Sequence, residues 1–333
     1  MVRRVLYAIL FVTLVSVVPG GAGAGTEGTA RIGTVKAPPA VPVLIAKEQG
    51  FFARQGVQME VAVFPTATAV RQALLDGSVD AAVLSVGATL QAFEQGNRFR
   101  NLVLLQGRPN ATILTHKALN IRRWDFGALM GKRIGVDARS GRTELLLRAL
   151  LLHARIPEGK VTIVPTGEFP EYLEAIRARR VDAQVTWEPG TSQLTLPTQL
   201  DVADVFLDMR ASDAPYPVSR MVEGSVVALD GWVRNHRDTG LRIAKAVSCA
   251  ERAMRTNPAL IARIYEQNFP GLGQDVYANI AKFQPAVYWP RITRENIRVI
   301  SQVYRKLGLL KGTVRFEDVV PDSFPLAWWG ECR

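Results

Sequence analysis

Two arginines stand in a short polar stretch, ARSGRT, at residues 138–143. Arg139 and Arg142 could each bind a carboxylate or a sulfonate through two parallel hydrogen bonds, or could face solvent. Ser140 and Thr143 stand just before the apolar run ELLLRALL, where a helix is expected to begin. Their hydroxyls could cap this helix, could hold an anionic or carbonyl oxygen at its N-terminus, or could do both. The stretch is therefore one candidate site for an oxygen-bearing ligand.

A second candidate site is the pair Trp187-Glu188, which follows the apolar segment VDAQVT. Trp187 could stack on a planar ligand, or it could be an ordinary aromatic side chain of the core. Glu188 could bind a ligand amine or cap its own helix, with Pro189 suited to the first helical turn. Taken together with Arg139 and Arg142, this pair fits a small zwitterion or an aromatic acid better than nitrate or bicarbonate.

Further candidates stand in the N-terminal half of the chain. Ser85 could bind a ligand or cap a helix expected at 88–95. Pro38 and Pro39 restrict the backbone of an early loop and remove two N–H donors from it. The complete set predicted to contact a ligand is Pro38, Pro39, Thr66, Ser85, Gly87, Arg139, Ser140, Arg142, Thr143, Trp187 and Glu188.

The sequence offers no recognisable catalytic or metal-binding motif. Its three histidines, His116, His153 and His236, are far apart along the chain and lie outside these stretches. The motifs HExxH and CxxC are absent, as is any cluster of histidine and cysteine. The triplet SVG at 85–87 resembles half of the nucleophile elbow G-x-S-x-G, but Val83 stands where the first glycine is required. We therefore expect a protein that is not an enzyme and that holds neither a metal nor a cofactor.

The candidate stretches belong to two similar halves of the chain. QALLDGSVDAAV at 72–83 aligns without gaps with EAIRARRVDAQV at 174–185, and RIG at 31–33 recurs at 133–135. Both repeats have an offset of 102 residues, and the related triplets FPT and VPT lie between them at an offset of 100. A period of this length is too long for a solenoid and predicts two similar half-domains.

Apolar strands alternate with helices in both halves. The second half shows this order in KRIGVD, TELLLRALLLHA, KVTIVP, PEYLEAIRAR and VDAQVTW. Such alternation is typical of βαβ units, so the predicted fold class is α/β, with two lobes and mostly parallel sheets. After residue 230 the pattern changes to successive helices, which would pack on a lobe already formed. In the first half, the pattern predicts strands at 30–35, 57–64, 79–85 and 101–106 and helices at 43–55, 67–77 and 90–95.

The repeat also predicts where a ligand binds. In parallel α/β sheets, ligands bind beyond the carboxyl ends of the strands, where loops lead into helix N-termini. These loops are KAPPA, PTAT and SVGA in the first half and ARSGRT, PTGE and WEPG in the second. The shared segment VDAxV is then scaffold, and the residues at 85–87 and 187–189 are expected to face a ligand from opposite sides. Asp80 and Asp182 precede these strands and are expected to be turn and capping residues instead.

The N-terminus has the features of a secretory signal peptide. Arg3 and Arg4 precede an uncharged apolar run at 5–18, and AGA at 22–24 supplies the small residues of a cleavage site. The apolar run is short for a membrane span. We therefore expect residues 1–24 to be removed after Ala24 and the mature protein to be periplasmic.

The charge and the cysteines add less about function. The chain has a net charge of +11, which becomes +9 when Arg3 and Arg4 leave with the signal peptide. The basic residues are scattered and form no nucleic-acid motif, so we expect a solvated basic surface and no nucleic-acid partner. In an exported protein, Cys249 and Cys332 could form a disulfide, or Cys249 could be a buried free thiol.

Several of these segments, taken in order, resemble a known family. RIGTV, PVLIAKEQGFFARQGVQMEV, ALLDGSVDAAVLS, GKRIGVDARSG and VDAQVTWEP resemble substrate-binding proteins of ABC importers, in the branch for sulfonates, taurine, nitrate and pyrimidine precursors. The resemblance covers residues 30 to 230. It implies a periplasmic clamshell that captures a small molecule and delivers it to an inner-membrane permease, and we expect this protein to be a monomer.

The resemblance also implies a division of the chain. Lobe I would comprise residues 30–110 and 225–333, and lobe II residues 111–224, with crossovers near 104–115 and 218–229. A receptor that presents its ligand to a membrane sensor is an alternative to import. Yeast-type pyrimidine synthases share this fold family, but their cysteine-rich motif is missing from this sequence.

Overall fold

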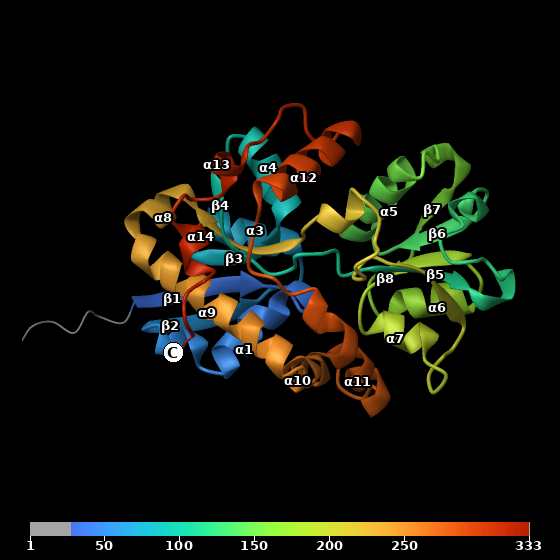
Figure 1. The fold of residues 1–333 in the computed structure, drawn as a ribbon, viewed down its shortest axis with the longest axis horizontal. Helices are drawn as coiled ribbons and strands as arrows, with labels where there is room; N and C mark the ends of the chain where they lie inside the picture. The colour runs from blue at the N-terminus through green and yellow to red at the C-terminus, as the bar shows by residue number, and fades with distance from the viewer. Residues whose placement is uncertain (1–27, 333) are drawn as a thin grey trace, which may run out of the picture.

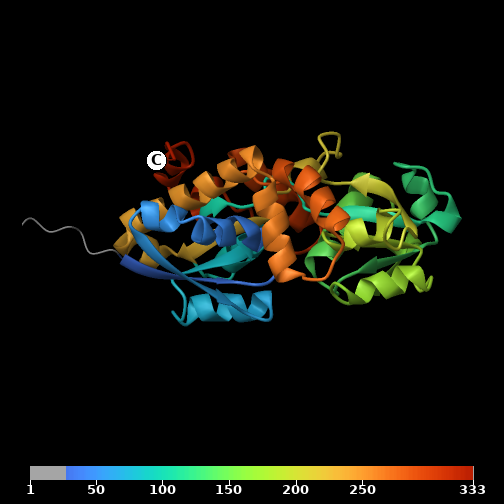
Figure 2. The ribbon, with the colours of Figure 1, turned by 90° about the horizontal axis from the view of Figure 1, so that it is seen from below.

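The computed structural model describes residues 28–332, so the predicted signal peptide at 1–24 lies outside the described residues. Two five-stranded sheets form two lobes that lie side by side along the longest axis of the molecule (Figures 1 and 2). Lobe I contains the sheet β2-β1-β3-β10-β4, and lobe II contains the sheet β7-β6-β8-β5-β9. The strands of lobe I are β1 (Gly28–Thr34), β2 (Val57–Val63), β3 (Ala81–Ser85), β4 (Phe99–Leu104) and β10 (Gly224–Leu229). Those of lobe II are β5 (Thr112–His116), β6 (Arg133–Val136), β7 (Thr162–Pro165), β8 (Ala183–Thr186) and β9 (Ala203–Asp208).

The two sheets have the same topology, which explains the internal repeat. The repeated RIG triplets lie in β1 and β6, and the repeated VDAxV segments lead into the central strands β3 and β8. In lobe I the backbone N–H of Arg31 donates to the Asp80 carboxylate over 2.8 Å. In lobe II the backbone N–H of Arg133 donates to the Asp182 carboxylate over the same distance. The two aspartates therefore tie neighbouring strands together.

Each sheet has one strand that runs against the other four. β1 is parallel to β2 and β3, whereas β10 is antiparallel to both β3 and β4. The same relation holds in lobe II, where β5 is antiparallel to both β8 and β9. The predicted fold class, a two-lobed α/β clamshell with mostly parallel sheets, is confirmed.

Helices cover the sheets and form most of the C-terminal segment, which lies on lobe I (Figure 1). Lobe I carries η1 (Pro38–Ala40), α1 (Val41–Glu48), α2 (Phe51–Arg54), α3 (Ala67–Leu75) and α4 (Val86–Glu94). Lobe II carries η2 (Lys117–Leu119), η3 (Phe126–Leu129), α5 (Arg142–His153), η4 (Glu158–Lys160), α6 (Glu171–Arg177), α7 (Gly190–Thr195) and η5 (Val218–Arg220). After β10 follow α8 (Asp230–Asn235), α9 (Arg237–Thr256), α10 (Ala259–Asn268), α11 (Gln274–Phe283), η6 (Gln284–Ala286), α12 (Arg294–Lys306), α13 (Phe316–Val319) and α14 (Phe324–Ala327).

Alternating side chains of the central strands belong to different hydrophobic clusters. In β3, Ala81 and Val83 pack in the cluster that includes α1 and α9, whereas Ala82 and Leu84 pack in the cluster that includes α3. Because side chains of a strand alternate between its two faces, the sheet of lobe I is buried on both faces. This explains why β3 has a nearly continuous apolar sequence.

Helix α12 contributes to the cores of both lobes. Its residues Ile297, Ile300 and Tyr304 belong to the main hydrophobic cluster of lobe I. Val299 and Val303, on another side of the same helix, belong to the cluster of lobe II that contains α5. The C-terminal segment therefore packs on lobe I and also joins the two lobes.

A disulfide between Cys249 and Cys332 fixes the end of the chain to α9. The sequence left open whether Cys249 pairs or is a free thiol, and the structure shows that it pairs. Trp328, close to this bond, is buried and donates from its indole N–H to the Leu102 carbonyl over 2.8 Å. Among residues 28–332, no helix is both long and apolar enough to cross a membrane.

Replacement of both cysteines, as Cys249→Ser and Cys332→Ser, should lower the free energy of unfolding. The bond joins residues 83 positions apart, so its loss gives the unfolded chain more conformational freedom. We expect the free energy of unfolding to fall by about 2–4 kcal/mol. Urea unfolding followed by circular dichroism measures this change. An unchanged midpoint in the double variant would show that the C-terminal segment is held without the disulfide.

Candidate ligand-binding site

The carboxyl-terminal edges of the two sheets face each other. The chain leaves lobe I at the end of β4 and passes through residues 105–111 into β5, the antiparallel strand of lobe II. It returns from the end of β9 through residues 209–223 into β10, the antiparallel strand of lobe I. An antiparallel strand starts at the edge where its neighbours end, so both crossovers connect carboxyl edge to carboxyl edge. The loops predicted to contact a ligand therefore lie on facing edges.

An ion pair joins these two edges. The Arg142 guanidinium, in the first turn of α5, donates to Glu223 Oε2 over 2.7 Å. Glu223 immediately precedes β10, and the same carboxylate oxygen accepts from the backbone N–H of Asn110 over 2.9 Å. Burial disfavours the charge of Arg142, but Glu223 and Asp137 outweigh this effect and raise the pKa of Arg142. The predicted ligand residue Arg142 thus has a carboxylate partner from the second crossover.

Other polar groups of the loop before α5 bond within the loop or to the first turn of α5. The Thr143 hydroxyl bonds to the Asp137 carboxylate, and the backbone N–H of Ser140 donates to Glu144 over 2.6 Å. Arg139 lies 3.4 Å from the carboxylate of Glu144. Both predicted arginines therefore already have acidic partners, which weakens the sequence argument for an anionic ligand.

The lobe I candidates lie at the ends of strands or the starts of helices. Thr66 Oγ1 accepts from the backbone N–H of Ala69 in the first turn of α3, and Ser85 Oγ accepts from that of Ala88 in the first turn of α4, each over 3.1 Å. Pro38 and Pro39 begin η1. A β-carbon at Gly87 would collide with the Tyr304 hydroxyl, so this position admits only glycine as α12 is placed. The hydroxyls of Thr66 and Ser85 act as helix caps, one of the two roles considered from the sequence for Ser85.

Trp187 lies in an aromatic cluster that reaches across the lobes. The side chain is 6% exposed and packs against Phe169 and Tyr172 of lobe II. Its ring centroid is also 6.2 Å from that of Phe269, which ends α10 in the C-terminal segment. Trp187 therefore has a packing role, and its ring face is covered by other aromatic side chains instead of being free to stack on a ligand.

Glu188 forms a buried network with Arg210. One carboxylate oxygen accepts from the Arg210 guanidinium over 2.7 Å, and the other accepts from the backbone N–H and the hydroxyl of Ser192 in α7. Arg210 also donates twice to Asp208, and together these carboxylates outweigh burial and raise the pKa of Arg210. Glu188 thus caps its own helix, one of the two roles considered from the sequence, and its charge is balanced within lobe II.

The structure brings together several residues that the sequence did not single out. Asn110 and Gln284 form a reciprocal amide pair, with both bonds at 2.7 Å, between the first crossover and η6. Arg210 and Glu223 lie in the second crossover, and Gln106 lies in the first. Arg210 follows the end of β9. Because ligands of α/β folds bind beyond strand ends, the sequence would have indicated Arg210 if β9 had been predicted as a strand.

Among the described residues, no group of His, Cys, Asp or Glu could hold a metal ion.

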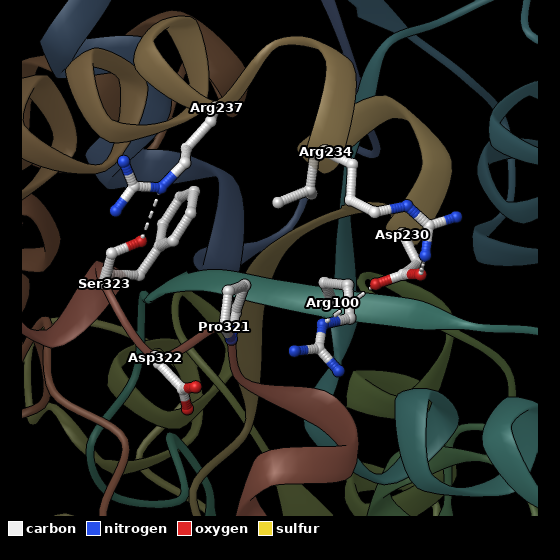
Figure 3. A pocket seen from close by; sticks show the side chains of 9 residues that line it. Arg100, Asp230, Arg234, Arg237, Pro321, Asp322 and Ser323 are labelled. Carbon is white, nitrogen blue, oxygen red and sulfur yellow. Dashed lines mark hydrogen bonds and ion pairs between the residues drawn. The ribbon is translucent and has the colours of Figure 1, made fainter.

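A separate cavity of about 280 Å³ lies at the outer part of lobe I (Figure 3). Asp230 lies between Arg100 and Arg234, at 3.5 Å and 2.6 Å from their nitrogens. Arg237 donates to the Ser323 hydroxyl over 3.2 Å. None of the predicted ligand loops contributes to this cavity, and its charges are largely paired among themselves. It is lined by Arg100, Asp230, Val233, Arg234, Arg237, Pro321, Asp322, Ser323 and Phe324.

Comparisons with known proteins agree with this architecture. The model of the NMT1-like family matches residues 23–266. The periplasmic aliphatic sulphonate binding protein SsuA from Escherichia coli superposes with a TM-score of 0.73 at 17% identity, covering 88% of this chain and 91% of that one. The alkanesulfonate-binding protein SsuA from Xanthomonas axonopodis pv. citri, bound to MOPS, superposes with a TM-score of 0.69 at 19% identity, covering 89% of this chain and 99% of that one. The periplasmic nitrate-binding protein NrtA from Synechocystis PCC 6803 superposes with a TM-score of 0.68 at 15% identity, covering 90% of this chain and 88% of that one. No curated protein sequence matches the chain.

The substitution Glu188→Ala should destabilise the ligand-free protein. Arg210 is almost completely buried, and removal of one of its two carboxylate partners should lower the free energy of unfolding by about 3 kcal/mol. Glu174→Ala is a matched control, because Glu174 and Arg177 form an exposed pair whose loss should change stability little. Urea unfolding of both variants measures the difference. Equal stability of the two variants would contradict the structural role of Glu188.

Proposed function

The chain belongs to the NMT1-like family, and on this premise we propose that it is an extracytoplasmic solute-binding protein of an ABC importer. It captures a small organic solute between its lobes and delivers the solute to a permease in the inner membrane. It binds the solute without transforming it and acts as a monomer. Residues 1–24 serve as the signal peptide that directs it to the periplasm.

One observation carries this proposal: ligand loops from two topologically equivalent lobes lie on facing carboxyl edges. Such edges are where α/β folds bind small molecules. The Arg142–Glu223 pair connects the two edges directly, so a molecule held near Arg142 would touch both lobes. Binding between two lobes joined by two crossovers is the arrangement in which hinge closure surrounds a ligand.

In the proposal, the solute contacts residues of both lobes. Lobe I contributes the η1 loop and the starts of α3 and α4, and lobe II contributes the loop before α5 and the loop after β8. Trp187 and Glu188 belong to the loop after β8 and shape it from within lobe II. The proposed contacts are Pro38, Pro39, Thr66, Ser85, Gly87, Arg139, Ser140, Arg142 and Thr143, whereas Trp187 and Glu188 hold the loop after β8 in place.

The structural neighbours support binding rather than catalysis. Those reported above are a sulphonate-binding protein, an alkanesulfonate-binding protein and a nitrate-binding protein, and two of them are described as periplasmic. Their likeness spans nearly the whole chain, so it includes both lobes and the C-terminal helices. These relatives favour a small polar solute and an extracytoplasmic location for this protein as well.

Protein exported to the periplasm and purified without denaturation should carry its solute. Denaturation followed by mass spectrometry of the supernatant should release one small organic compound in a ratio near one to one. The same compound, returned to refolded protein at 100 times its Kd, should raise the free energy of unfolding by about 2.7 kcal/mol. Thermal denaturation with and without the compound measures this effect.

Refolded protein without the compound is the matched control. Release of no compound, together with no shift of the melting temperature by sulfonates, taurine, aminopyrimidines or aromatic acids, would contradict the proposed function. A mature N-terminus that still contains Arg3, read from the intact mass, would contradict cleavage after Ala24.

A further inference from the structure

Gln106 has a buried side-chain amide without a hydrogen-bond partner. The residue lies in the first crossover and is 0% exposed. Neither Oε1 nor Nε2 has a partner among residues 28–332. Most buried polar groups in folded proteins are paired, and an unpaired one costs about 1–3 kcal/mol. An amide in which both groups are unpaired therefore calls for a functional explanation.

The amide lies where the lobe I ligand loops meet. The backbone of Gln106 is tied to the start of β10, since its carbonyl accepts from Glu223 N–H over 3.0 Å and its own N–H donates to Gly224. Gly224 stands opposite Ser85 in the sheet register. A β-carbon added at Gly224 would lie 2.6 Å from Pro39 and 3.6 Å from Gln106 Oε1. The Gln106 amide is thus directed at the junction of the Pro39 loop, the end of β3 and the start of β10.

The charged groups on the facing edge of lobe II do not favour an added anion. Arg142 is paired with Glu223 and Arg139 with Glu144, so both arginines already have carboxylate partners. A further acidic residue, Glu168, follows β7, and its carboxylate lies close enough to Asp137 and Arg142 to interact electrostatically with both. Partial desolvation and the nearby Asp137 carboxylate raise the pKa of Glu168, although the residue is exposed.

Acidic groups therefore outnumber basic ones around the Arg142 side of the site. Arg139 and Arg142 face the four carboxylates of Asp137, Glu144, Glu168 and Glu223. The net charge of the whole chain, +11, has the opposite sign. A sulfonate or carboxylate would meet repulsion here, whereas a neutral or cationic molecule would not.

We propose that Gln106 is a ligand-binding residue and that the solute is neutral or cationic, with a donor beside an acceptor at its buried end. A primary carboxamide and a urea are such groups, because a glutamine side chain can donate to their oxygen and accept from the adjacent nitrogen. The Gln106 side chain is covered in the arrangement described here, so the solute reaches it when the lobes part. This inference rests on the proposed solute-binding function and specifies the class of solute.

The test compares two glutamines. Gln106→Leu replaces the unpaired amide with an apolar side chain of similar size and should leave the unliganded melting temperature unchanged or raise it. Gln284→Leu is the control, because it breaks the amide pair with Asn110 and should lower the melting temperature. Titration calorimetry with nicotinamide, phenylurea, taurine and ethanesulfonate then gives the affinities. Nicotinamide or phenylurea should bind the wild type and should bind Gln106→Leu at least tenfold more weakly.

Several results would overturn the inference. Tighter binding of taurine or ethanesulfonate than of nicotinamide and phenylurea would refute the solute class. Equal affinity of an amide probe for wild type and Gln106→Leu would refute the residue assignment. A loss of stability in Gln106→Leu as large as in Gln284→Leu, with unchanged affinity, would show that the amide is structural.

The compound released from periplasmic protein separates this inference from the proposed function. A neutral or cationic compound that carries a donor beside an acceptor supports both. An anionic compound refutes the solute class and leaves the binding function intact. Release of no compound, together with no binding of the four probes, refutes both.

Discussion

The connection of residues 105–111 holds the carboxyl edges of the two sheets within about 30 Å of each other, because an extended chain spans at most about 3.3–3.6 Å per residue. This constraint determines the direction of β5, which must start at the edge facing lobe I and so runs against its neighbours. The second crossover has the same effect on β10. The loops that lead into α3, α4 and α5 therefore converge on one region between the lobes. Glu223 lies in the second crossover and meets Arg142 there.

The polar interior between the lobes is organised as paired charges. Arg142 binds Glu223, and Arg210 binds both Glu188 and Asp208. Buried ion pairs add little net stability, but removal of one partner leaves an uncompensated charge. Such pairs fix the loops in defined positions, and they leave the unpaired Gln106 amide as the notable polar group of the lobe I edge.

The C-terminal segment couples the lobes on both sides of this region. On one side, α12 contributes Val299 and Val303 to the core cluster that contains α5. On the other, the Asn279 amide of α11 donates to the Ser192 hydroxyl of α7 over 2.9 Å. Movement of lobe II relative to lobe I must therefore rearrange α11 and α12 as well as the two crossovers. The C-terminal helices, which the sequence identified only as a cover on one lobe, contact both lobes.

The local sequence was sufficient to predict the repeated units. RIG, VDAxV and the intervening amphipathic helices have strong periodicity, and they correspond to β1, β3, β6 and β8 and to the helices between them. Gly308 has a positive φ of 72° just after α12, a backbone conformation that glycine adopts readily at a helix end. The strands β5, β9 and β10 were not recognised, because their partners come from distant parts of the chain. The same reason hid Glu223, which meets Arg142 only through the second crossover.

The central claim is that the two lobes close around a solute. Spin labels at Gln72 in α3 and Arg177 in α6 are suited to test it, because both positions are exposed and lie on equivalent helices of the two lobes. Pulsed electron resonance then gives the distance distribution between them, with and without a saturating amount of the compound that the periplasmic protein releases. Closure around the solute predicts a broader distribution at longer distances without the compound and a narrower one at shorter distances with it. A single distribution that the compound leaves unchanged would contradict closure of the lobes around the solute.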